Sequence, residues 1–489
     1  MTTRRIAMDF NRRHLMTGVG AAAVLAGLPF RVRAAETVSP LMTRLSTYMA
    51  EAAGKPLPPE VVERTKQAIL DTFAAMISGA GLPPGEFAIK FARAYGGEKI
   101  ATVAASNVVC GPIEAALVNG MLAHSDETDD THPASLSHPG ASAIPAALAT
   151  CEKFGRDGTR FLRAVALGYD VGTRVTAMLG KQEYQAETHR ASHTIAGTFC
   201  AGAAAGCSAS LNATQMRWLL SYTAQQAGGI ASWQRDTQHI EKGFDFAGGP
   251  ARSGVTAALL VEAGGTGVED VFSGADNFLE AYQPMHDKAM LIDGLGSRYE
   301  VMRTDVKKWT VGSPIQAPLD ALYNLHQKNR IVPDEVTKIV VRVAPHEASV
   351  VDNRDLPDIS LQYMMAVMLL DKTASFKAAH DVARMKDPEI MKQRAKIILE
   401  GDEELEKLLP KRAAIVEVTM KDGRVLRERV ETVRGTSGNP MPRSEIVEKA
   451  RDLIVPILGA EKFKRLNDAV FGLENVKNIL ELRPFLQKA

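Results

Sequence analysis

A run of small residues at positions 193–209, HTIAGTFCAGAAAGCSA, most constrains the fold of this chain. A helix built from this run has no polar face, so it favours a buried position. Gly197, Ala201, Ala204 and Ala205 would let neighbouring helices approach it closely. We therefore expect a central helix enclosed by other helices, which favours an all-α domain around it.

Helical patterns also dominate the rest of the first 300 residues. Pro58 and Pro59 open an amphipathic segment in which apolar residues recur at helical spacing up to Met76. Asn212 is a candidate N-cap for the helix that follows the small-residue run. We see almost no strand pattern in this part. Further helices are expected at 86–95, 112–123, 160–178, 214–226 and 252–263.

The pattern changes after residue 305. Lys338–Ala344 is rich in β-branched residues, and Ala413–Val430 is typical of a hairpin around Asp422 and Gly423. Helices are expected at Pro318–Lys328, Ser360–Leu370 and Pro388–Glu400, and a Gly/Ser/Pro linker at 435–440. The predicted fold is mainly α: a large helical domain (36–304 and 441–489) with a smaller α+β domain (305–440) inserted into it.

The first 34 residues are typical of an export signal. Arg12-Arg13 precedes a weakly apolar run from Leu15 to Phe30 and a cleavage-like Val32-Arg33-Ala34, which resembles a twin-arginine signal. The alternative is an uncleaved anchor, but the run falls short of the roughly 20 residues that span a bilayer. We expect cleavage near Ala35, a periplasmic location and no stable membrane anchor.

The overall charge excludes some partners. The formal net charge is +1, with 45% hydrophobic and 24% charged residues, as in ordinary globular proteins. This balance argues against a nucleic-acid partner. The first 34 residues carry six Arg and one Asp, so removing them leaves a net charge of +1 − 5 = −4. An anionic substrate would then need local positive charge.

Residues 115–145 gather the titratable groups that indicate a functional site. Such groups between apolar helices are costly unless they are paired, bind a ligand or do chemistry. A metal site is one alternative, although the histidine spacing matches no standard zinc pattern. Helix capping and turns are the structural alternative for some of them. The segment holds His124, Asp126, Glu127, Asp129, Asp130, His132 and His138.

Several motifs resemble the MmgE/PrpD family, which includes 2-methylcitrate dehydratases, cis-aconitate decarboxylases and an iminodisuccinate epimerase. The resemblance implies a helical domain with an inserted lid domain, a homodimer, and chemistry without a metal or organic cofactor. By position, it implies site residues at Glu127, Thr131, His138, His193 and Lys242. The motifs are Asn119-Gly120, His124, Asp129-Asp130-Thr131-His132, His138-Pro139-Gly140, Pro145, Gly168-Tyr169-Asp170, His193, Gly197-Thr198, Lys242, Ala251-Arg252-Ser253-Gly254 and Lys308-Trp309.

The chain departs from the family pattern at three positions. Glu127 stands where members often have aspartate, so its carboxylate reaches one methylene further. Asp245 stands where a histidine usually follows the lysine, and Gly312 takes the place of the lid histidine of the decarboxylases. The loss at Gly312 disfavours decarboxylation in particular.

The family's shared step implies a small di- or tricarboxylate substrate that loses a proton from carbon beside a carboxylate. Histidine suits such proton transfer because its pKa lies near working pH. We predict that His138 and His193 act as acid and base, and that Glu127 or Asp130 orients an imidazole. Lys242 and Arg252 would hold carboxylates. The leading hypothesis is a dehydratase of a hydroxy-polycarboxylate. The alternatives are an epimerase or isomerase of an amino- or imino-dicarboxylate, and a non-catalytic polycarboxylate-binding protein.

Overall fold

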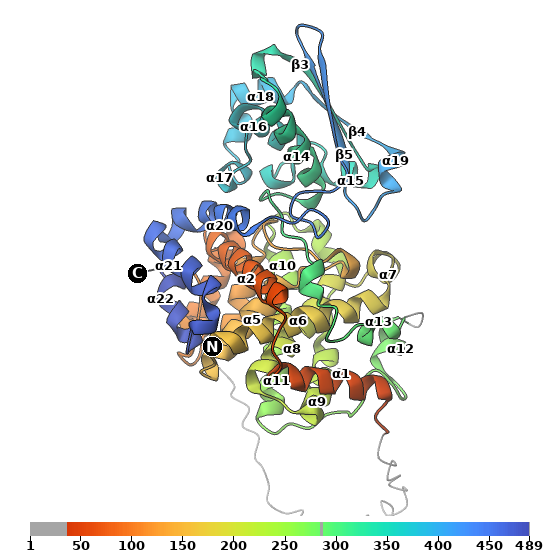
Figure 1. Ribbon diagram of the computed structural model, residues 1–489, viewed down its shortest axis with the longest axis vertical. Coiled ribbons are helices and arrows are strands. Elements are labelled where there is room, and N and C mark those ends of the chain that lie inside the picture. Colours follow the sequence, from red (N-terminus) through yellow and green to blue (C-terminus); the bar gives the residue numbers. More distant parts are fainter. Residues whose placement is uncertain (1–36, 284–286, 489) are drawn as a thin grey trace, which may run out of the picture. The chain divides into compact units, whose positions relative to one another are not determined.

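The computed structural model describes residues 37–283 and 287–488 (Figure 1). The predicted export signal lies outside the described residues, so the signal, its cleavage and the periplasmic location stay predictions. Among the helices of the described ranges, none is both long and apolar enough to cross a membrane.

Most of the described chain is helical, which confirms the prediction of a mainly α fold. Asn212 caps helix α9 as expected, because its side chain accepts the Gln215 amide at 3.0 Å. The helices before residue 300 are α1 (Pro40–Ala52), α2 (Pro59–Gly79), α3 (Pro83–Tyr95), α4 (Pro112–Ala123), α5 (Gly140–Lys153), α6 (Gly158–Leu179), α7 (Lys181–Thr188), α8 (Ser192–Ala209), α9 (Ala213–Gln226), α10 (Ile240–Gly243), α11 (Gly249–Glu262), α12 (Phe278–Tyr282) and α13 (Ala289–Ile292).

Helix α8 is the predicted central helix. It packs against α5, α6, α9 and α11, and its residues are buried from Ser192 to Cys207 (Figure 1). The small residues are needed for this packing. A Cβ added at Gly254 of α11 would lie 2.3 Å from the Gly202 amide nitrogen of α8. No side chain fits at that approach, so the expectation of close helix contacts is confirmed.

The sheet after residue 330 has the strand order β4-β3-β5-β6. Strand β3 (Val336–Val343) lies antiparallel to β5 (Ala414–Met420), which forms the predicted hairpin with β6 (Val425–Val430). Gly423 has φ 88° in the hairpin turn, a left-handed conformation that glycine adopts readily. Strand β4 (Ile397–Gly401) runs parallel to β3.

Two secondary-structure predictions were wrong. The helix expected to reach Glu400 ends at Arg394, because the β-branched pair Ile397-Ile398 joins the edge of the sheet as β4. In the first part, β1 (Ala101–Thr102) and β2 (Val109–Cys110) form a short ladder that was not expected. The later helices are α14 (Ser313–Lys328), α15 (Pro345–Val351), α16 (Leu361–Asp371), α17 (Phe376–Ala379), α18 (Pro388–Arg394), α19 (Glu403–Glu406), α20 (Arg443–Leu458), α21 (Ala460–Phe471) and α22 (Arg483–Leu486).

Buried apolar side chains form two large clusters. One draws on residues 42–306 and 441–486, and the other on residues 309–433. The chain enters and leaves the second cluster at neighbouring points, since the Val306 amide donates to the Gly435 carbonyl at 2.9 Å. Helix α20 returns to α2, where Lys449 and Asp71 form a buried ion pair at 2.6 Å. The boundaries at 305 and 440 and the lid arrangement stay predictions.

Candidate active site

The segment between α4 and α5 carries the predicted titratable residues into the interior. Helix α4 ends as the His124 amide donates to the Gly120 carbonyl at 3.1 Å. The Asp126 carboxylate then accepts the Thr128 amide at 2.8 Å and the Thr128 hydroxyl at 2.7 Å, which closes a tight turn. Helix α5 begins at Gly140, where a Cβ would lie 2.5 Å from the Tyr169 hydroxyl. The local sequence thus folds the segment back on itself, between packed helices.

Two histidines of this segment and one from α8 meet around Phe246, which lies in a short π-helix (Phe244–Gly248). Ring centroids lie 4.8 Å apart for His124 and His138, and 5.3 Å apart for His138 and His193. Phe246 stacks on His193 at 3.9 Å and on His124 at 4.7 Å. His239, which sequence reasoning left without a role, lies 5.2 Å from His124. The structure therefore brings both predicted acid/base histidines into one cluster.

The carboxylate beside these imidazoles is Asp129. Its Oδ2 lies 2.8 Å from His124 Nδ1 and 3.4 Å from His138 Nδ1. Burial alone would raise the pKa of Asp129, but the two histidines outweigh it and hold the pKa well below its usual value. The His138 Nδ1–H also donates to the Asp130 carbonyl at 2.6 Å. Because Nδ1 makes both of these contacts, Nε2 is the ring nitrogen left to face a substrate.

His193 has the properties of a neutral base. Its Nδ1 is buried and has no hydrogen-bond partner in the described residues. Burial, reinforced by the positive charges that His138, His124 and Lys242 can carry, holds the pKa of His193 well below its usual value. The imidazole is therefore unprotonated at neutral pH.

Two lysines meet the carboxylate of Glu127. Lys242 Nζ bonds to Glu127 Oε1, and Lys307 Nζ lies 3.4 Å from Oε2 and 2.7 Å from the Glu127 carbonyl oxygen. Burial would raise the pKa of Glu127, but the two lysines hold it well below its usual value. Lys307 was not predicted, although it adjoins the motif Lys308-Trp309. Lys242 Nζ also lies 5.2 Å from the centroid of the Phe246 ring, against which the imidazoles pack.

Neither predicted orienting carboxylate contacts an imidazole. The Glu127 oxygens face the two lysines. The Asp130 carboxyl accepts the Tyr169 hydroxyl at 2.5 Å and the Gly140 amide at 3.1 Å. Burial, aided by the charge of Asp129, raises the pKa of Asp130 to about 7. The orienting role that was expected of Glu127 or Asp130 falls to the Asp129 carboxylate, and Asp130 contributes only its backbone carbonyl.

No hydrogen bond or ion pair joins Thr131 or Arg252 to the clustered histidines in the part of the chain that the structure describes. Thr131 exchanges two backbone hydrogen bonds with Asp305, at 2.9 and 2.7 Å, and its hydroxyl has no hydrogen-bond partner among the described residues. Arg252 is exposed on α11, with its guanidinium 5.8 Å from the Phe244 ring centroid. Helical periodicity turns Ala251, Ser253 and Gly254 inward and Arg252 outward. This position gives Arg252 no contact with the clustered histidines, and its role in holding a substrate carboxylate stays a prediction.

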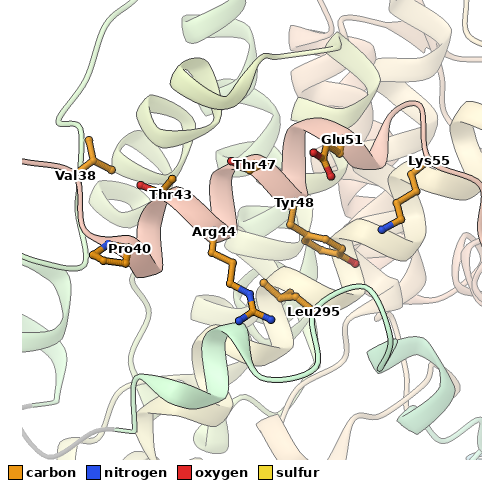
Figure 2. Close-up of a pocket in the computed structure, with 9 residues that line it drawn as sticks. All are labelled: Val38, Pro40, Thr43, Arg44, Thr47, Tyr48, Glu51, Lys55 and Leu295. Atoms are coloured by element: carbon orange, nitrogen blue, oxygen red, sulfur yellow. The ribbon is translucent and has the colours of Figure 1, made fainter.

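An open surface pocket lies elsewhere, along α1. It has a volume of about 550 Å³ and contains none of the clustered histidines. Figure 2 shows Arg44 and Tyr48 of α1, with Lys55 beyond its end, turned toward Leu295. We assign the chemistry to the histidine cluster, because proton-transfer groups meet there.

Comparison with known proteins identifies the family. The MmgE/PrpD N-terminal domain matches residues 43–290, and the MmgE/PrpD C-terminal domain matches residues 309–475. The chain belongs to the MmgE/PrpD family. This confirms the resemblance drawn from the motifs.

Three relatives in the MmgE/PrpD family align along most of the chain. The cis-aconitate decarboxylase of Aspergillus terreus is 24% identical over 486 residues, which are 92% of this chain and 96% of the relative. The cis-aconitate decarboxylase-like protein oryM of Aspergillus oryzae is 24% identical over 468 residues, 90% of this chain and 95% of the relative. The human cis-aconitate decarboxylase is 25% identical over 449 residues, 87% of this chain and 90% of the relative.

Two departures from the MmgE/PrpD pattern have structural consequences. Gly312 lies at the start of α14, and its amide donates to the Asp358 carbonyl at 2.9 Å. A histidine from the same part of the chain, His380, reaches the site segment instead: its Nε2 lies 3.1 Å from Asp126 Oδ2. Burial would lower the pKa of His380, but Asp126 outweighs it and raises the pKa to about 9. Sequence reasoning gave His380 no role.

Asp245, the third departure, borders His193. The Thr194 hydroxyl donates to its backbone carbonyl at 2.9 Å, and burial raises the pKa of its carboxyl to about 7. A carboxyl in this condition is partly protonated at neutral pH. It therefore adds little negative charge beside the base.

His124, Asp129 and His138 could together hold a metal ion, since their ligand atoms lie within 4.8 Å of one another. Both histidine Nδ1 atoms already form hydrogen bonds, that of His124 with Asp129 at 2.8 Å and that of His138 with the Asp130 carbonyl at 2.6 Å. A metal at those nitrogens would displace both bonds. The residues thus fit a hydrogen-bonded proton-transfer network, and the expectation of chemistry without a metal or cofactor stays a prediction, as does the homodimer.

Proposed function

We propose that this MmgE/PrpD protein is a lyase of small polycarboxylates, most simply a dehydratase of a hydroxy-polycarboxylate. One observation carries the proposal. His193 is a buried, neutral imidazole with an unpartnered nitrogen and Lys242 nearby, and Lys242 shares the Glu127 carboxylate with Lys307. Removal of a proton from carbon next to a carboxylate requires such a base together with cations that hold the carboxylate.

In the proposed reaction the histidines transfer protons and the lysines bind the negative charge of the substrate. His193 takes the proton from carbon, and His138, oriented through its Nδ1–H, shares the acid/base work. Lys242 and Lys307 bind a substrate carboxylate and stabilise the negative charge that develops on it as the proton leaves. Glu127 forms ion pairs with both lysines in the structure. A substrate carboxylate would therefore replace Glu127 at one of them, so binding includes an exchange of one carboxylate for another.

The names of the relatives favour a second candidate, decarboxylation of a cis-aconitate-like compound. That reaction loses CO2 and then adds a proton to carbon, so it needs an acid but no base. The neutral His193 favours dehydration over it. Epimerisation uses the same base and only returns the proton to the other face. A protein that binds a polycarboxylate without turnover would need the two lysines but no base.

Incubation in D2O with citrate-, malate- and aspartate-like compounds separates these functions. Deuterium exchange with alkene formation identifies a dehydratase, exchange with inversion alone an epimerase, and release of CO2 a decarboxylase. Binding without exchange refutes the lyase proposal. His138→Asn should abolish turnover with a melting temperature close to that of the parent, and retained activity would remove His138 from the mechanism.

A further inference from the structure

Thr128 lies between the two carboxylates of the site that have different partners. Glu127 before it pairs with lysines, and Asp129 after it contacts imidazoles. Thr128 is fully buried, and Asp126 accepts its amide at 2.8 Å and its hydroxyl at 2.7 Å. The Thr128 carbonyl belongs to the rigid peptide plane that leads into Asp129, so its direction affects where the Asp129 side chain points. A buried carbonyl in this position needs a donor.

Lys449 of α20 supplies that donor. Its Nζ donates to the Thr128 carbonyl at 2.9 Å and forms an ion pair with Asp71 of α2 at 2.6 Å. The Lys449 side chain is 4% exposed, and α20 packs along α2 (Figure 1). Lys307 makes the matching bond one residue earlier, to the Glu127 carbonyl at 2.7 Å. Two buried ammonium groups therefore hold two successive carbonyls of the turn.

The ion pair between Lys449 and Asp71 does little for stability by itself. Removing two charges from water is costly, and apolar side chains of similar volume are often as stable in place of a buried pair. An apolar side chain could not hold the Thr128 carbonyl, however. Asp71 thus compensates the charge of Lys449, and Lys449 fixes a peptide of the site.

We propose that Lys449 is a positioning residue of the active site: through the Thr128 carbonyl it holds the Asp129 carboxylate against the imidazoles. Asp129 Oδ2 lies 2.8 Å from His124 Nδ1 and 3.4 Å from His138 Nδ1, and rotation of the Thr128 peptide would change both distances. The polar contacts of Lys449 in the described ranges are with Thr128 and Asp71, so it acts on the reaction through Asp129. The effect on turnover rests on the proposed function.

The test compares Asp71→Asn with Asp71→Asn/Lys449→Met in the full chain. K449M alone would leave Asp71 as an unpaired buried charge and would destabilise the fold, so D71N removes that charge first. In D71N the Asn amide oxygen can still accept from Lys449, and the bond to Thr128 stays. We expect D71N/K449M to lose about 10²-fold in kcat relative to D71N, the effect of a misplacement of about 1 Å, with a smaller change in KM. Equal turnover by the two variants would overturn the proposal.

Lys66→Met is the matched control. Lys66 is also a buried lysine, and its Nζ donates to the Phe471 carbonyl at 2.8 Å and to the Glu474 carboxylate at 2.7 Å. Neither partner belongs to the site, so K66M should keep most of the parent turnover. A loss in K66M as large as that in D71N/K449M would overturn the proposal, because the loss of any buried lysine would then explain it.

The imidazole nitrogens report the position of Asp129 without a substrate. In protein with isotope-labelled histidine, the NMR shifts of the His124 and His138 nitrogens depend on their contacts with Asp129. We expect both to differ between D71N and D71N/K449M, with no change at exposed His189. Unchanged shifts at His124 and His138 would overturn the proposal. A parent that turns over no compound refutes the proposed function instead, and the shifts still decide the role of Lys449.

Discussion

Lys307 provides a direct test of the charge balance at the site. Its Nζ lies 2.7 Å from the Glu127 carbonyl, 3.4 Å from Glu127 Oε2 and 4.0 Å from Asp129 Oδ1, and its side chain is 3% exposed. Lys307→Met keeps most of the side-chain volume and removes the charge. Two buried carboxylates then lose a compensating cation.

The contacts of Lys307 set the expected loss in the free energy of unfolding. A hydrogen bond that involves a charged group contributes about 1.5–3 kcal/mol, and loss of one partner of a buried ion pair costs about 3–5 kcal/mol. Glu127 keeps its bond to Lys242. We therefore expect K307M to lower the free energy of unfolding by about 3 kcal/mol, the low end of that range.

Urea unfolding followed by circular dichroism measures this change from the midpoint and slope. Lys308→Met is the control, because Lys308 Nζ lies over the Trp309 and Tyr323 rings, at 4.5 and 4.0 Å, and should contribute only about 1 kcal/mol. The pKa of Glu127 is depressed in the folded state, so its stabilisation is present above the unfolded pKa and lost as pH falls. K307M should begin to lose stability at a higher pH. A K307M stability within about 0.5 kcal/mol of the parent would refute the reasoning.

Three further results are expected. Arg252→Ala should change the free energy of unfolding by less than about 0.5 kcal/mol and leave KM unaltered, because Arg252 is exposed; a large rise in KM would return Arg252 to the site. The pKa of His380 is raised from 6.5 to about 9 in the folded protein, so protonation of His380 stabilises the fold by about 3 kcal/mol. This stabilisation is complete below pH 6.5 and is lost as pH rises through 9. His380→Gln should flatten the fall in unfolding free energy between those values, and an unchanged slope would contradict the ion pair with Asp126. Elemental analysis of the purified protein should find zinc, iron and manganese well below one per chain, and a stoichiometric metal would reverse the assignment of His124, Asp129 and His138 to a hydrogen-bonded network.

Local patterns predicted most of the helices. The small-residue run at 193–209 predicted the central position of α8, since a helix without a polar face must be buried. Asp422-Gly423 predicted the hairpin because few other pairs suit its turn. Ile397-Ile398-Leu399 could not be assigned in the same way. A short apolar run suits either a helix end or a strand, and only the free edge of β3 decides between them.

The site residues were predictable where they fall within the motifs of the family resemblance, and less so elsewhere. His138 and His193 were expected and meet in one cluster. Lys307 was missed, because a lysine in a polar run carries no signal until its burial is known. His380 is 18% exposed and follows a four-residue helix, so nothing local distinguishes it from a surface histidine.

Two site predictions differ from the observed contacts for the same reason. Which of Glu127, Asp129 and Asp130 faces the imidazoles depends on the turn after α4, where adjacent residues point to different sides. Arg252 was chosen for its charge, and its place on α11 was decided by the neighbours that pack against α8. Sequence reasoning identified the segment and the residue types. Tertiary packing selected the side chains.

Solvent exchange measures the action of His193 as a base. The parent and His193→Asn are incubated in D2O with the polycarboxylate panel, and deuterium on the carbon beside the carboxylate is followed by NMR. His189→Asn is the control, because His189 is exposed and only four residues away. We predict exchange by the parent and by H189N, and a loss of at least about 10²-fold in H193N. Exchange by H193N at the parent rate, or no exchange by the parent with any compound, would contradict the account.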